Sequence, residues 1–244
     1  MFKQEVNLVI PMAGRGQRFV DAGISTIKPL IRAHDKYLFE WAIQSFNNLP
    51  AQFNIHLYCI VLTEHIHEQQ IDKIITKTYP NATIIPLAQT TRGQAETVLL
   101  AKPFLKPELP LLIFNNDTYF QSKTLPTILT TATHDGAILC FESNLPKYSY
   151  AQTDTTGKVL KTTEKVVISP YASNGLYYFK NGYDFFNTVE SMISAQDTHA
   201  GEYYVIPVYN KLITQKKQIQ MVLVEKNYIF GTPEELELFQ KASL

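Results

Sequence analysis

Glycine and basic residues follow the first apolar run of the sequence, at a spacing that suits phosphate binding. Gly14 and Gly16 flank Arg15, Arg18 follows closely, and Lys28 stands further along. Glycine lets a backbone turn tightly and brings its N–H groups against a ligand, since no Cβ stands in the way. Guanidinium groups beside such donors grip a polyphosphate through paired, charge-assisted hydrogen bonds. The segment therefore predicts a phosphate-binding loop, with Lys28 as a further positive charge over the same anion.

Two widespread phosphate-binding motifs do not fit this loop. A Walker A motif needs Gly-Lys-Ser/Thr after the glycines, and the dinucleotide fingerprint needs a third glycine where Phe19 stands. The simpler interpretation is a strand-to-helix turn that contains glycine. The two arginines and the later Lys-Pro-Leu favour phosphate binding over that simpler turn.

A second polar group ends another apolar run, where Asn115, Asn116 and Asp117 follow Leu111–Phe114. An ionised carboxylate beside bound phosphates suits Mg²⁺, which takes one or two carboxylates together with phosphate oxygens. Taken alone, an Asn-Asp pair is more often a strand-end turn that caps the next helix. The residues by themselves leave both interpretations open.

The first loop resembles the signature of the nucleotidyltransferases that activate sugar 1-phosphates and related phosphoesters. In that family a strand ends in Ala/Gly-Gly-x-Gly-x-Arg-hydrophobic, and Lys-Pro-Leu or Lys-Pro follows several residues on. Gln17 departs from the usual Thr or Ser, and residues 20–27 replace a more usual Pro-Leu-Thr segment. The resemblance spans almost the whole chain. The matching residues of the loop are Ala13, Gly14, Gly16, Arg18, Phe19, Lys28, Pro29 and Leu30.

The resemblance implies roles on the nucleotide side. Arg15, Arg18 and Lys28 would stabilise the pyrophosphate, and Asp117 would hold Mg²⁺. The stretch 89–96 would hold the base, although its residues alone fit a helix start capped by Thr equally well. The nucleotide-binding residues that the family pattern implies are Met12, Ala13, Gly14, Gly16, Gln89, Gly93, Gln94 and Asn116.

The resemblance also implies an acceptor side. The family has Glu-Lys, a short loop and then Ala-x-x-Gly-hydrophobic-Tyr, which Glu164-Lys165 and residues 172–177 match in order. There the Glu bonds sugar hydroxyls and the Lys bonds the acceptor phosphate, so Lys165 is expected to be catalytic. The residues alone read as an exposed charged pair and an ordinary strand. The expected acceptor-binding residues are Ser149, Glu164, Asn174, Gly175 and Glu202.

The end of the chain carries the largest departure from the family. Gly231-Thr-Pro-Glu-Glu-Leu236 matches the closing segment, yet Ile229 stands where sugar enzymes have a second metal-binding Asp. Glu225 is the nearest acidic residue upstream. Either Asp117 holds the metal with phosphates and water, or Glu225 substitutes, or the activity is weakened.

Hydrophobic periodicity and turn residues predict the elements. Strand-like and helix-like segments alternate over the first 140 residues, and a hairpin around Gly157 follows. Thr232 is expected to cap the last helix, with Glu235 completing a capping box. The expected strands are 6–12, 55–62, 82–86, 111–115, 136–141, 148–152, 158–163, 172–179 and 219–224. The expected helices are 38–49, 64–79, 94–101, 122–133, 183–193, 203–214 and 233–241.

These elements predict an α/β fold: a mostly parallel sheet flanked by helices, with a small antiparallel sheet on the acceptor side. The resemblance names it as the Rossmann-like, glycosyltransferase-A-like nucleotidyltransferase fold. We expect one domain over residues 1–244, with a nucleotide-binding half at about 1–142 and an acceptor-binding half at about 143–244. Ligands of such sheets bind beyond the carboxyl ends of the strands, which puts the loops at 11–19, 88–94 and 115–119 on one rim.

Composition narrows the class of protein. The 22 basic and 22 acidic residues give no net charge, which removes the electrostatic footprint of a general nucleic-acid binder. Cys59 and Cys140 lie in apolar runs and are expected to be buried and unpaired, as in a reducing compartment. We find no signal peptide and no apolar run near the roughly 18 residues of a membrane span. We therefore expect a cytoplasmic protein without membrane or nucleic-acid partners, and a homodimer stays open.

The sequence therefore predicts a nucleotidyltransferase of the pyrophosphorylase type. It would join an NMP moiety from an NTP, CTP before dTTP, to a phosphomonoester, with Mg²⁺ as cofactor and pyrophosphate as product. The acceptor would be a sugar 1-phosphate or a phosphorylated alcohol or amino compound, for surface polysaccharide biosynthesis. Two other classes stay open: a glycosyltransferase on the related fold, and a non-catalytic nucleotide-binding protein.

Overall fold

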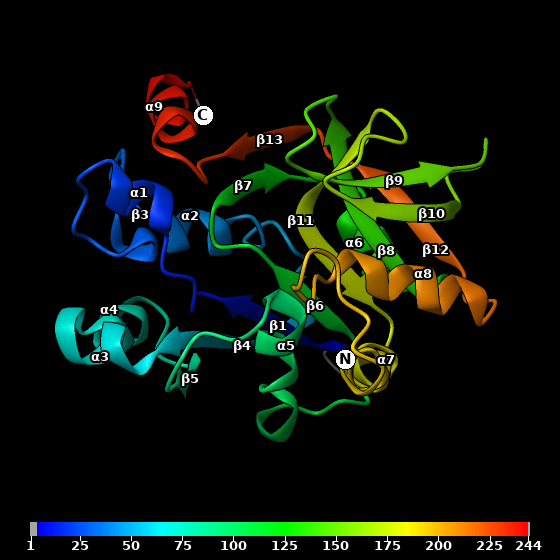
Figure 1. Cartoon of the computed structure of the whole chain (residues 1–244), viewed down its shortest axis with the longest axis horizontal. Helices are drawn as coiled ribbons and strands as arrows, with labels where there is room; N and C mark the ends of the chain where they lie inside the picture. Colours follow the sequence, from blue (N-terminus) through cyan, green and yellow to red (C-terminus); the bar gives the residue numbers. More distant parts are fainter. Residues whose placement is uncertain (1–3, 244) are drawn as a thin grey trace.

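A nine-stranded mixed sheet runs through the middle of the computed structural model, which describes residues 4–243 (Figure 1). Residues 1–3 and 244, the ends of the expected domain, lie outside the described residues. The strand order is β10-β9-β11-β6-β1-β4-β5, and β8 joins this path through β11 and carries β12. The strands of this sheet are β1 (Gln4–Pro11), β4 (Phe53–Leu62), β5 (Thr83–Leu87), β6 (Leu111–Phe114), β8 (Gly136–Glu142), β9 (Ser149–Thr153), β10 (Val159–Glu164), β11 (Tyr171–Phe179) and β12 (Ile219–Leu223).

The parallel part of the sheet is built on β1, which pairs with β4 on one side and with β6 on the other. Val6, Leu8, Val9 and Ile10 are almost completely buried. A parallel strand covered on both faces reads as a continuous apolar run, and this explains why β1 has no alternating pattern. The carboxyl ends of β1 and β6 therefore emerge side by side.

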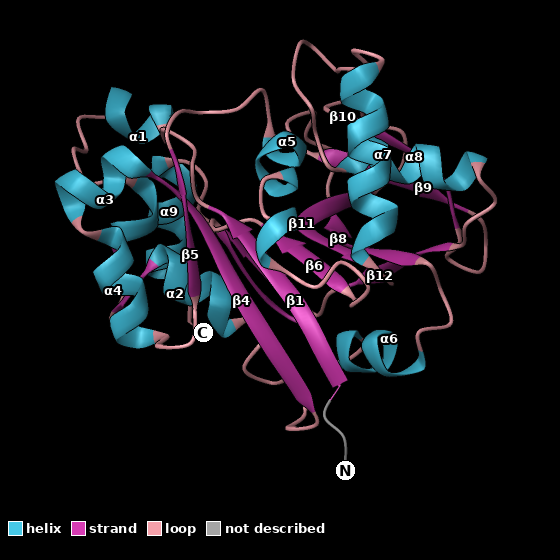
Figure 2. Ribbon diagram, turned by 90° about the horizontal axis from the view of Figure 1, so that it is seen from below, coloured by secondary structure: helices cyan, strands magenta, loops and turns pink. Residues whose placement is uncertain are grey.

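Helices cover both faces of the sheet (Figure 2). One apolar cluster joins the sheet to α5, α7 and α8, and a second joins the other face to α2, α4 and α6. A third, smaller cluster lies under α1 and α9, around Trp41. The helices are α1 (Gln17–Asp21), α2 (Leu38–Gln44), α3 (Thr63–Gln69), α4 (Ile71–Thr78), α5 (Gln94–Leu99), α6 (Leu125–Thr131), α7 (Gly182–Ser194), α8 (Ile206–Thr214) and α9 (Pro233–Lys241), with short 3₁₀ turns η1 (Lys28–Leu30) and η2 (Lys102–Phe104).

Two small antiparallel sheets lie outside the main one. The first pairs β2 (Arg32–Ala33) with β3 (Lys36–Tyr37), and the second pairs β7 (Thr118–Gln121) with β13 (Lys226–Ile229). The predicted fold class is confirmed: an α/β sheet flanked by helices, with small antiparallel sheets. The predicted hairpin β9–β10 is continuous with the main sheet, because Tyr150 of β9 pairs with Ala172 of β11.

Several predicted elements differ from the structure. The helix predicted at 64–79 is two helices, because Gln70 adopts a left-handed conformation with φ 51° and ends α3. The helix predicted at 38–49 ends as an α-helix at Gln44, and the one predicted at 203–214 begins only at Ile206. Strands β7 and β13 were not predicted, because each acquires its hydrogen bonds from a partner about a hundred residues away.

The cysteines behave as expected. Cys59 and Cys140 lie in β4 and β8, fully buried and free, and burial raises the pKa of both thiols. Within residues 4–243, we find no helix with the length and apolar character needed to cross a membrane.

Candidate active site

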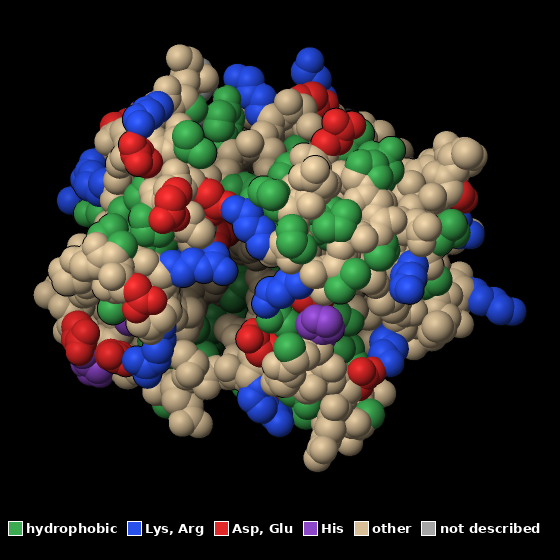
Figure 3. Space-filling model, turned by 45° about the horizontal axis from the view of Figure 1, so that its top comes forward, with side chains coloured by type: hydrophobic (Ala, Val, Ile, Leu, Met, Phe, Trp, Pro, Cys, Tyr) green, Lys and Arg blue, Asp and Glu red, His purple; other side chains and the backbone are tan. Residues whose placement is uncertain are grey.

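A cavity of about 560 Å³ opens where β1 and β6 end. Figure 3 shows a hollow near the middle of one face, with Lys and Arg side chains and Asp and Glu side chains around its edge. The three loops expected on one rim all contribute to the cavity wall, as the α/β architecture requires. The lining residues are Pro11, Ala13, Gly14, Gly16, Lys28, Thr90, Thr91, Gly93, Gln94, Thr97, Asn115, Asn116, Asp117 and Glu202.

The first loop reaches the cavity through its backbone. Gly16 caps α1 with φ +62°, a conformation that favours glycine. A Cβ on Gly16 would lie 3.1 Å from the Cβ of Lys28, so the glycine also lets the 28–30 turn approach. Met12 lies elsewhere: its side chain is buried in the core, and its N–H donates to the Ile60 carbonyl.

The two arginines of this loop point into solvent. Arg15 forms a long ion pair with Glu64, at 3.8 Å, and its side chain is 60% exposed. Arg18 is also exposed, on α1. Neither is among the residues that line the cavity, whereas Lys28 is. The structure therefore brings one of the three predicted cationic side chains of this loop into the cavity.

Lys28 and Asp117 form an ion pair inside the cavity wall. Lys28 Nζ donates to Asp117 Oδ2 at 2.7 Å, and about a fifth of each side chain is exposed. Gly231 packs against this pair, because a Cβ placed on it would lie 3.0 Å from Asp117 Oδ2. The backbone carbonyl of Asp117 also accepts the N–H of Phe230, the residue that follows β13. This hydrogen bond fixes the backbone from which the carboxylate projects.

Glu225 does not join Asp117. The β7–β13 ladder pairs Ile229 with Thr118 beside Asp117, while Glu225 precedes the opposite end of the ladder. The Glu225 carboxylate accepts the N–H of Lys123 at 3.0 Å. Among residues 4–243, we find no group of three or more His, Cys, Asp or Glu side chains arranged to hold a metal ion.

The loop before α5 is held tightly against Tyr203. Gly93 has φ +131°, and a Cβ there would lie 2.5 Å from the Tyr203 carbonyl oxygen. The N–H of Tyr203 donates to the Arg92 carbonyl at 2.7 Å, and the Tyr203 carbonyl accepts the N–H of Ala95 at 2.9 Å. Position 93 must therefore be glycine because a Cβ would clash with the backbone of Tyr203. The sequence alone had linked this glycine to the binding of a base.

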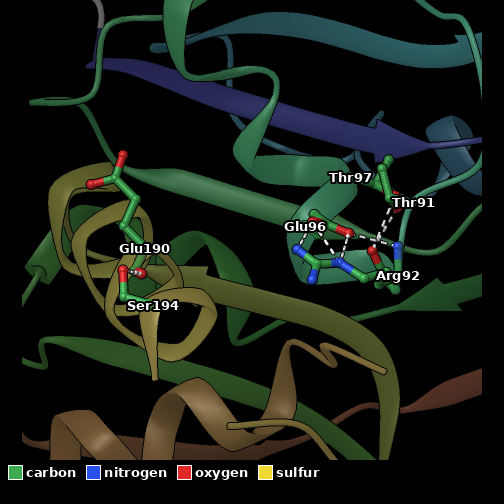
Figure 4. A network of polar contacts seen from close by, with 7 residues as sticks. Thr91, Arg92, Glu96, Thr97, Glu190 and Ser194 are labelled. Carbon is green, nitrogen blue, oxygen red and sulfur yellow. Dashed lines mark hydrogen bonds and ion pairs between the residues drawn. The ribbon is translucent and has the colours of Figure 1, made fainter. Parts of the chain in front are cut away.

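Side chains reinforce the same loop (Figure 4). Arg92 folds back onto Glu96, with Nη2 donating to Oε1 at 2.5 Å and its N–H donating to Oε2 at 2.6 Å. The hydrogen bond from Arg92 lowers the pKa of the Glu96 carboxyl. The hydroxyls of Thr91 and Thr97 lie 2.5 Å apart, and both contact the Gly93 carbonyl.

The predicted base-binding residues separate in the structure. Gln94 lines the cavity and donates from Nε2 to Asn115 Oδ1 at 2.7 Å, while Gln89 is exposed and outside the wall. Sequence reasoning did not select Asn115, although it directly precedes two selected residues. It also did not select three threonines of the wall: Thr90 and Thr91, which stand in the polar stretch before α5, and Thr97, which lies within α5.

Two of the five predicted acceptor residues line a second cavity of about 240 Å³. Glu164 and Glu202 line it, and Glu202 lines the first cavity as well. Glu164 is 7% exposed and accepts the Ser149 hydroxyl at 2.5 Å. Burial raises the pKa of the Glu164 carboxyl, although the Ser149 hydrogen bond and Lys165 act in the opposite direction.

Lys165, Asn174 and Gly175 are not among the residues that line these two cavities. Lys165 has φ +55°, and its Nζ donates to the Tyr204 hydroxyl, whose residue lines the second cavity, at 2.6 Å. Gly175 has φ +88° and packs against Asn115 of the first cavity wall, whose N–H donates to the Gly175 carbonyl. Asn174 is buried and accepts the N–H of Leu176.

Known proteins share this fold. A nucleoside-diphosphate-sugar pyrophosphorylase from Vibrio cholerae RC9 is 30% identical, with a TM-score of 0.83 over 96% of this chain and 100% of that one. A UDP-glucose pyrophosphorylase complexed with UDP-glucose has a TM-score of 0.75 at 16% identity, over 98% and 97% of the two chains. The inositol-1-phosphate CTP transferase from T. maritima has a TM-score of 0.71 at 13% identity, over 99% and 96%.

A comparison with curated proteins finds no match. The family model described as nucleotidyl transferase matches residues 8–228, which include both cavities' lining loops. That match extends from β1 to β13, so it covers the glycine loop, the Lys28–Asp117 pair and the strands around Glu164. The chain belongs to the nucleotidyl transferase family of enzymes.

Proposed function

We propose that this enzyme transfers the nucleotidyl group of an NTP, CTP before dTTP, to a small phosphomonoester and releases pyrophosphate. One observation carries the proposal. A polar cavity with a glycine loop, Lys28 and Asp117 shares Glu202 with a second cavity that contains Glu164. Two adjoining sites, one suited to phosphates and one rich in hydrogen-bond acceptors, are what a two-substrate transfer requires.

The reaction needs no nucleophile from the protein. A phosphate oxygen of the acceptor attacks the α-phosphorus in line, a new P–O bond forms, and the bond to the β-phosphate oxygen breaks. Pyrophosphate leaves with the electron pair. Catalysis then consists of positioning two anions and stabilising the charge that develops on them.

Basic side chains would supply that stabilisation. Lys28 lies in the cavity wall and would turn from Asp117 to the phosphates of the nucleotide. Arg15 and Arg18 are exposed at the loop and free to swing onto the leaving pyrophosphate, which guanidinium groups bind through paired hydrogen bonds. Lys165 would align the acceptor phosphate, and Ser149 would orient the Glu164 carboxylate toward the acceptor.

The donors at Asp117 suit Mg²⁺ shared with the nucleotide. Mg²⁺ binds through one or two carboxylates together with substrate phosphates and water, so one carboxylate suffices. Ile229 offers no side-chain oxygen, and Glu225 is bonded to Lys123, so the remaining ligands would be phosphate oxygens and water. When bound, the ion would neutralise charge on the α-phosphate.

The remaining assignments belong to the same proposal. Gln94, Asn116 and the backbone around Gly93 would hold the base, and Glu164 and Glu202 would hold the acceptor. The single domain would divide into a nucleotide half at 1–142 and an acceptor half at 143–244. We place the enzyme in the cytoplasm, in surface polysaccharide biosynthesis, with a sugar 1-phosphate or a phosphorylated alcohol or amino compound as acceptor.

The test is pyrophosphate release from CTP, dTTP, UTP, GTP and ATP, each with Mg²⁺ and a panel of phosphomonoesters. We expect release with one NTP that depends on one acceptor, and a drop of about a hundredfold or more in Asp117→Asn. Asp21→Asn, which changes an exposed carboxylate near α1, is the matched control and should keep full activity.

Other results would point to the two alternative classes. Release of an NDP from a nucleotide sugar, without pyrophosphate from any NTP, would identify a glycosyltransferase. Tight NTP binding without turnover for any acceptor would identify a nucleotide-binding protein without catalysis.

A further inference from the structure

Glu235 contacts two segments that lie far apart in the sequence: Gly231, beside Asp117, and the pair Lys147–Tyr148. The sequence assigned it to the capping box of α9, and its N–H does donate to the hydroxyl of Thr232 at 3.2 Å. Its carboxylate does not complete the predicted capping box, because it accepts the N–H of Gly231 and not that of the N-cap residue Thr232. Oε2 accepts the N–H of Gly231 at 3.1 Å, and Oε1 accepts Lys147 Nζ at 2.5 Å and the Tyr148 hydroxyl at 3.3 Å.

One end of this connection lies beside Asp117. A Cβ on Gly231 would be 3.0 Å from Asp117 Oδ2 and 3.3 Å from Glu235 Oε2. The two carboxylates therefore converge on the bare Cα of Gly231. Gly231, whose N–H donates to Glu235, is the same residue that packs against the Lys28–Asp117 pair.

The other end reaches the acceptor residues. Tyr148 contacts Glu235 through its hydroxyl, and its carbonyl accepts the N–H of Lys165 at 3.0 Å. The next residue, Ser149, donates to Glu164. Lys165 holds a left-handed conformation without being glycine, a strained state that needs neighbouring contacts to persist.

The surroundings of Glu235 strengthen its ion pair with Lys147. The Glu235 side chain is 16% exposed and that of Lys147 is 40% exposed, so the ion pair is partly screened by water on the lysine side. The Glu235 hydrogen bond raises the pKa of Lys147, and the lysine ammonium also lies 5.1 Å over the Tyr148 ring. Charge-assisted hydrogen bonds of this kind are stronger than neutral ones.

We propose that Glu235 is a positioning residue for the acceptor: it ties the start of α9, beside Asp117, to Tyr148 and so fixes Lys165 and Glu164 relative to the nucleotide. The assignment rests on the proposed function, because it concerns where the acceptor phosphate meets the nucleotide. It predicts that loss of the contact harms acceptor use and spares NTP binding.

The experiment compares Glu235→Gln with Lys147→Met, the double variant, and Glu237→Gln as control. Glu237 lies on the same helix and pairs with Lys241 on the exposed face. We expect the acceptor KM to rise about tenfold in each of the first two variants, the worth of one charge-assisted hydrogen bond. The NTP Kd, measured by equilibrium binding without acceptor, should change less than about twofold.

The double variant tests whether the two single variants lose the same interaction or two independent ones. A Gln at 235 can still accept from Gly231 and Tyr148, so the loss common to both single variants is the charge-assisted bond between Lys147 and Glu235, and the double variant should be little worse than either single variant. Additive effects, an unchanged acceptor KM, or an NTP Kd that rises in parallel with the acceptor KM would each refute the positioning role.

A second readout keeps the two proposals distinguishable. If the unmodified enzyme releases no pyrophosphate with any acceptor, the proposed function fails, and hydrogen exchange decides the positioning role alone. The Lys165 amide should exchange about tenfold faster in Glu235→Gln than in Glu237→Gln, since its acceptor carbonyl on Tyr148 is then less constrained. Equal exchange rates in the two variants would overturn it.

Discussion

Two of the three loops that line the first cavity differ in how much of their shape the rest of the protein fixes. In the loop at 14–18, Gly14 has no described heavy atom within 4 Å of its ideal Cβ position, and Arg15 forms one long, exposed ion pair. In the loop at 90–94, Gly93 is packed on Tyr203 and Arg92 is bonded to Glu96.

The difference in rigidity would suit the parts of the nucleotide that we assign to these loops, the base and the pyrophosphate. A base is flat and rigid, and a preformed wall binds it without paying for ordering at the moment of binding. A pyrophosphate changes its charge and position during transfer, and exposed arginines can follow it. We therefore expect changes in the 90–94 loop to act mainly on stability and binding, and changes in the 14–18 loop to act mainly on rate.

The largest expected effect is that of Gly93→Ala. The added Cβ would lie within 3 Å of three Tyr203 backbone atoms, at a φ that alanine rarely adopts, so we expect a loss of about 3 kcal/mol or more in the free energy of unfolding. Gly14→Ala meets no atom and should stay within about 0.5 kcal/mol. Urea unfolding of both variants measures this, and equal losses would erase the contrast between the loops.

The next effect is that of Arg18→Ala. Removal of an exposed guanidinium should lower kcat about a hundredfold, because it removes charge stabilisation from the transition state, and should leave Tm almost unchanged. Arg32→Ala, on the exposed strand β2, is the matched control and should keep its rate. Should Arg18→Ala turn over normally, the exposed arginines would have no part in pyrophosphate departure.

The smallest effect is that of Glu96→Gln, which replaces the carboxylate that binds Arg92 with a neutral amide. We expect a loss of about 1 kcal/mol at pH 7. The folded protein holds the pKa of Glu96 below its unfolded value, so this stabilisation is present above the unfolded pKa and disappears as pH falls through the folded one. The difference in stability between wild type and variant should therefore shrink as pH falls below the unfolded pKa and vanish once the folded pKa is passed. A gap that is independent of pH would show that the carboxylate charge is not what holds the loop.

The sequence predicted best what is local in the chain. The glycine loop, the apolar strands and the last helix each depend on residues within a few positions, and the fold class follows from their order. What it missed depends on distant partners: β7 with β13, Gly93 with Tyr203, and Glu235 with Lys147. Glu235 is instructive, because its local pattern predicted a cap correctly and gave no sign of the second partner.

The position of some predicted site residues also depends on distant contacts. Gln89 and Gln94 both stand in a polar stretch, yet only Gln94 lines the cavity. Gly93, directly before Gln94, packs against Tyr203, more than a hundred residues later. Asn115 escaped selection because its neighbours carried the resemblance, whereas its own place is set by Gln94 and Gly175.

The Lys28–Asp117 pair changes what ligand binding means for the charge of the cavity. The counterion of the carboxylate is part of the chain itself. Binding of a cation with a nucleotide would then be an exchange of partners, in which Asp117 would turn from an ammonium group to the metal and Lys28 from a carboxylate to a phosphate. Neither charge would lose one partner without gaining another.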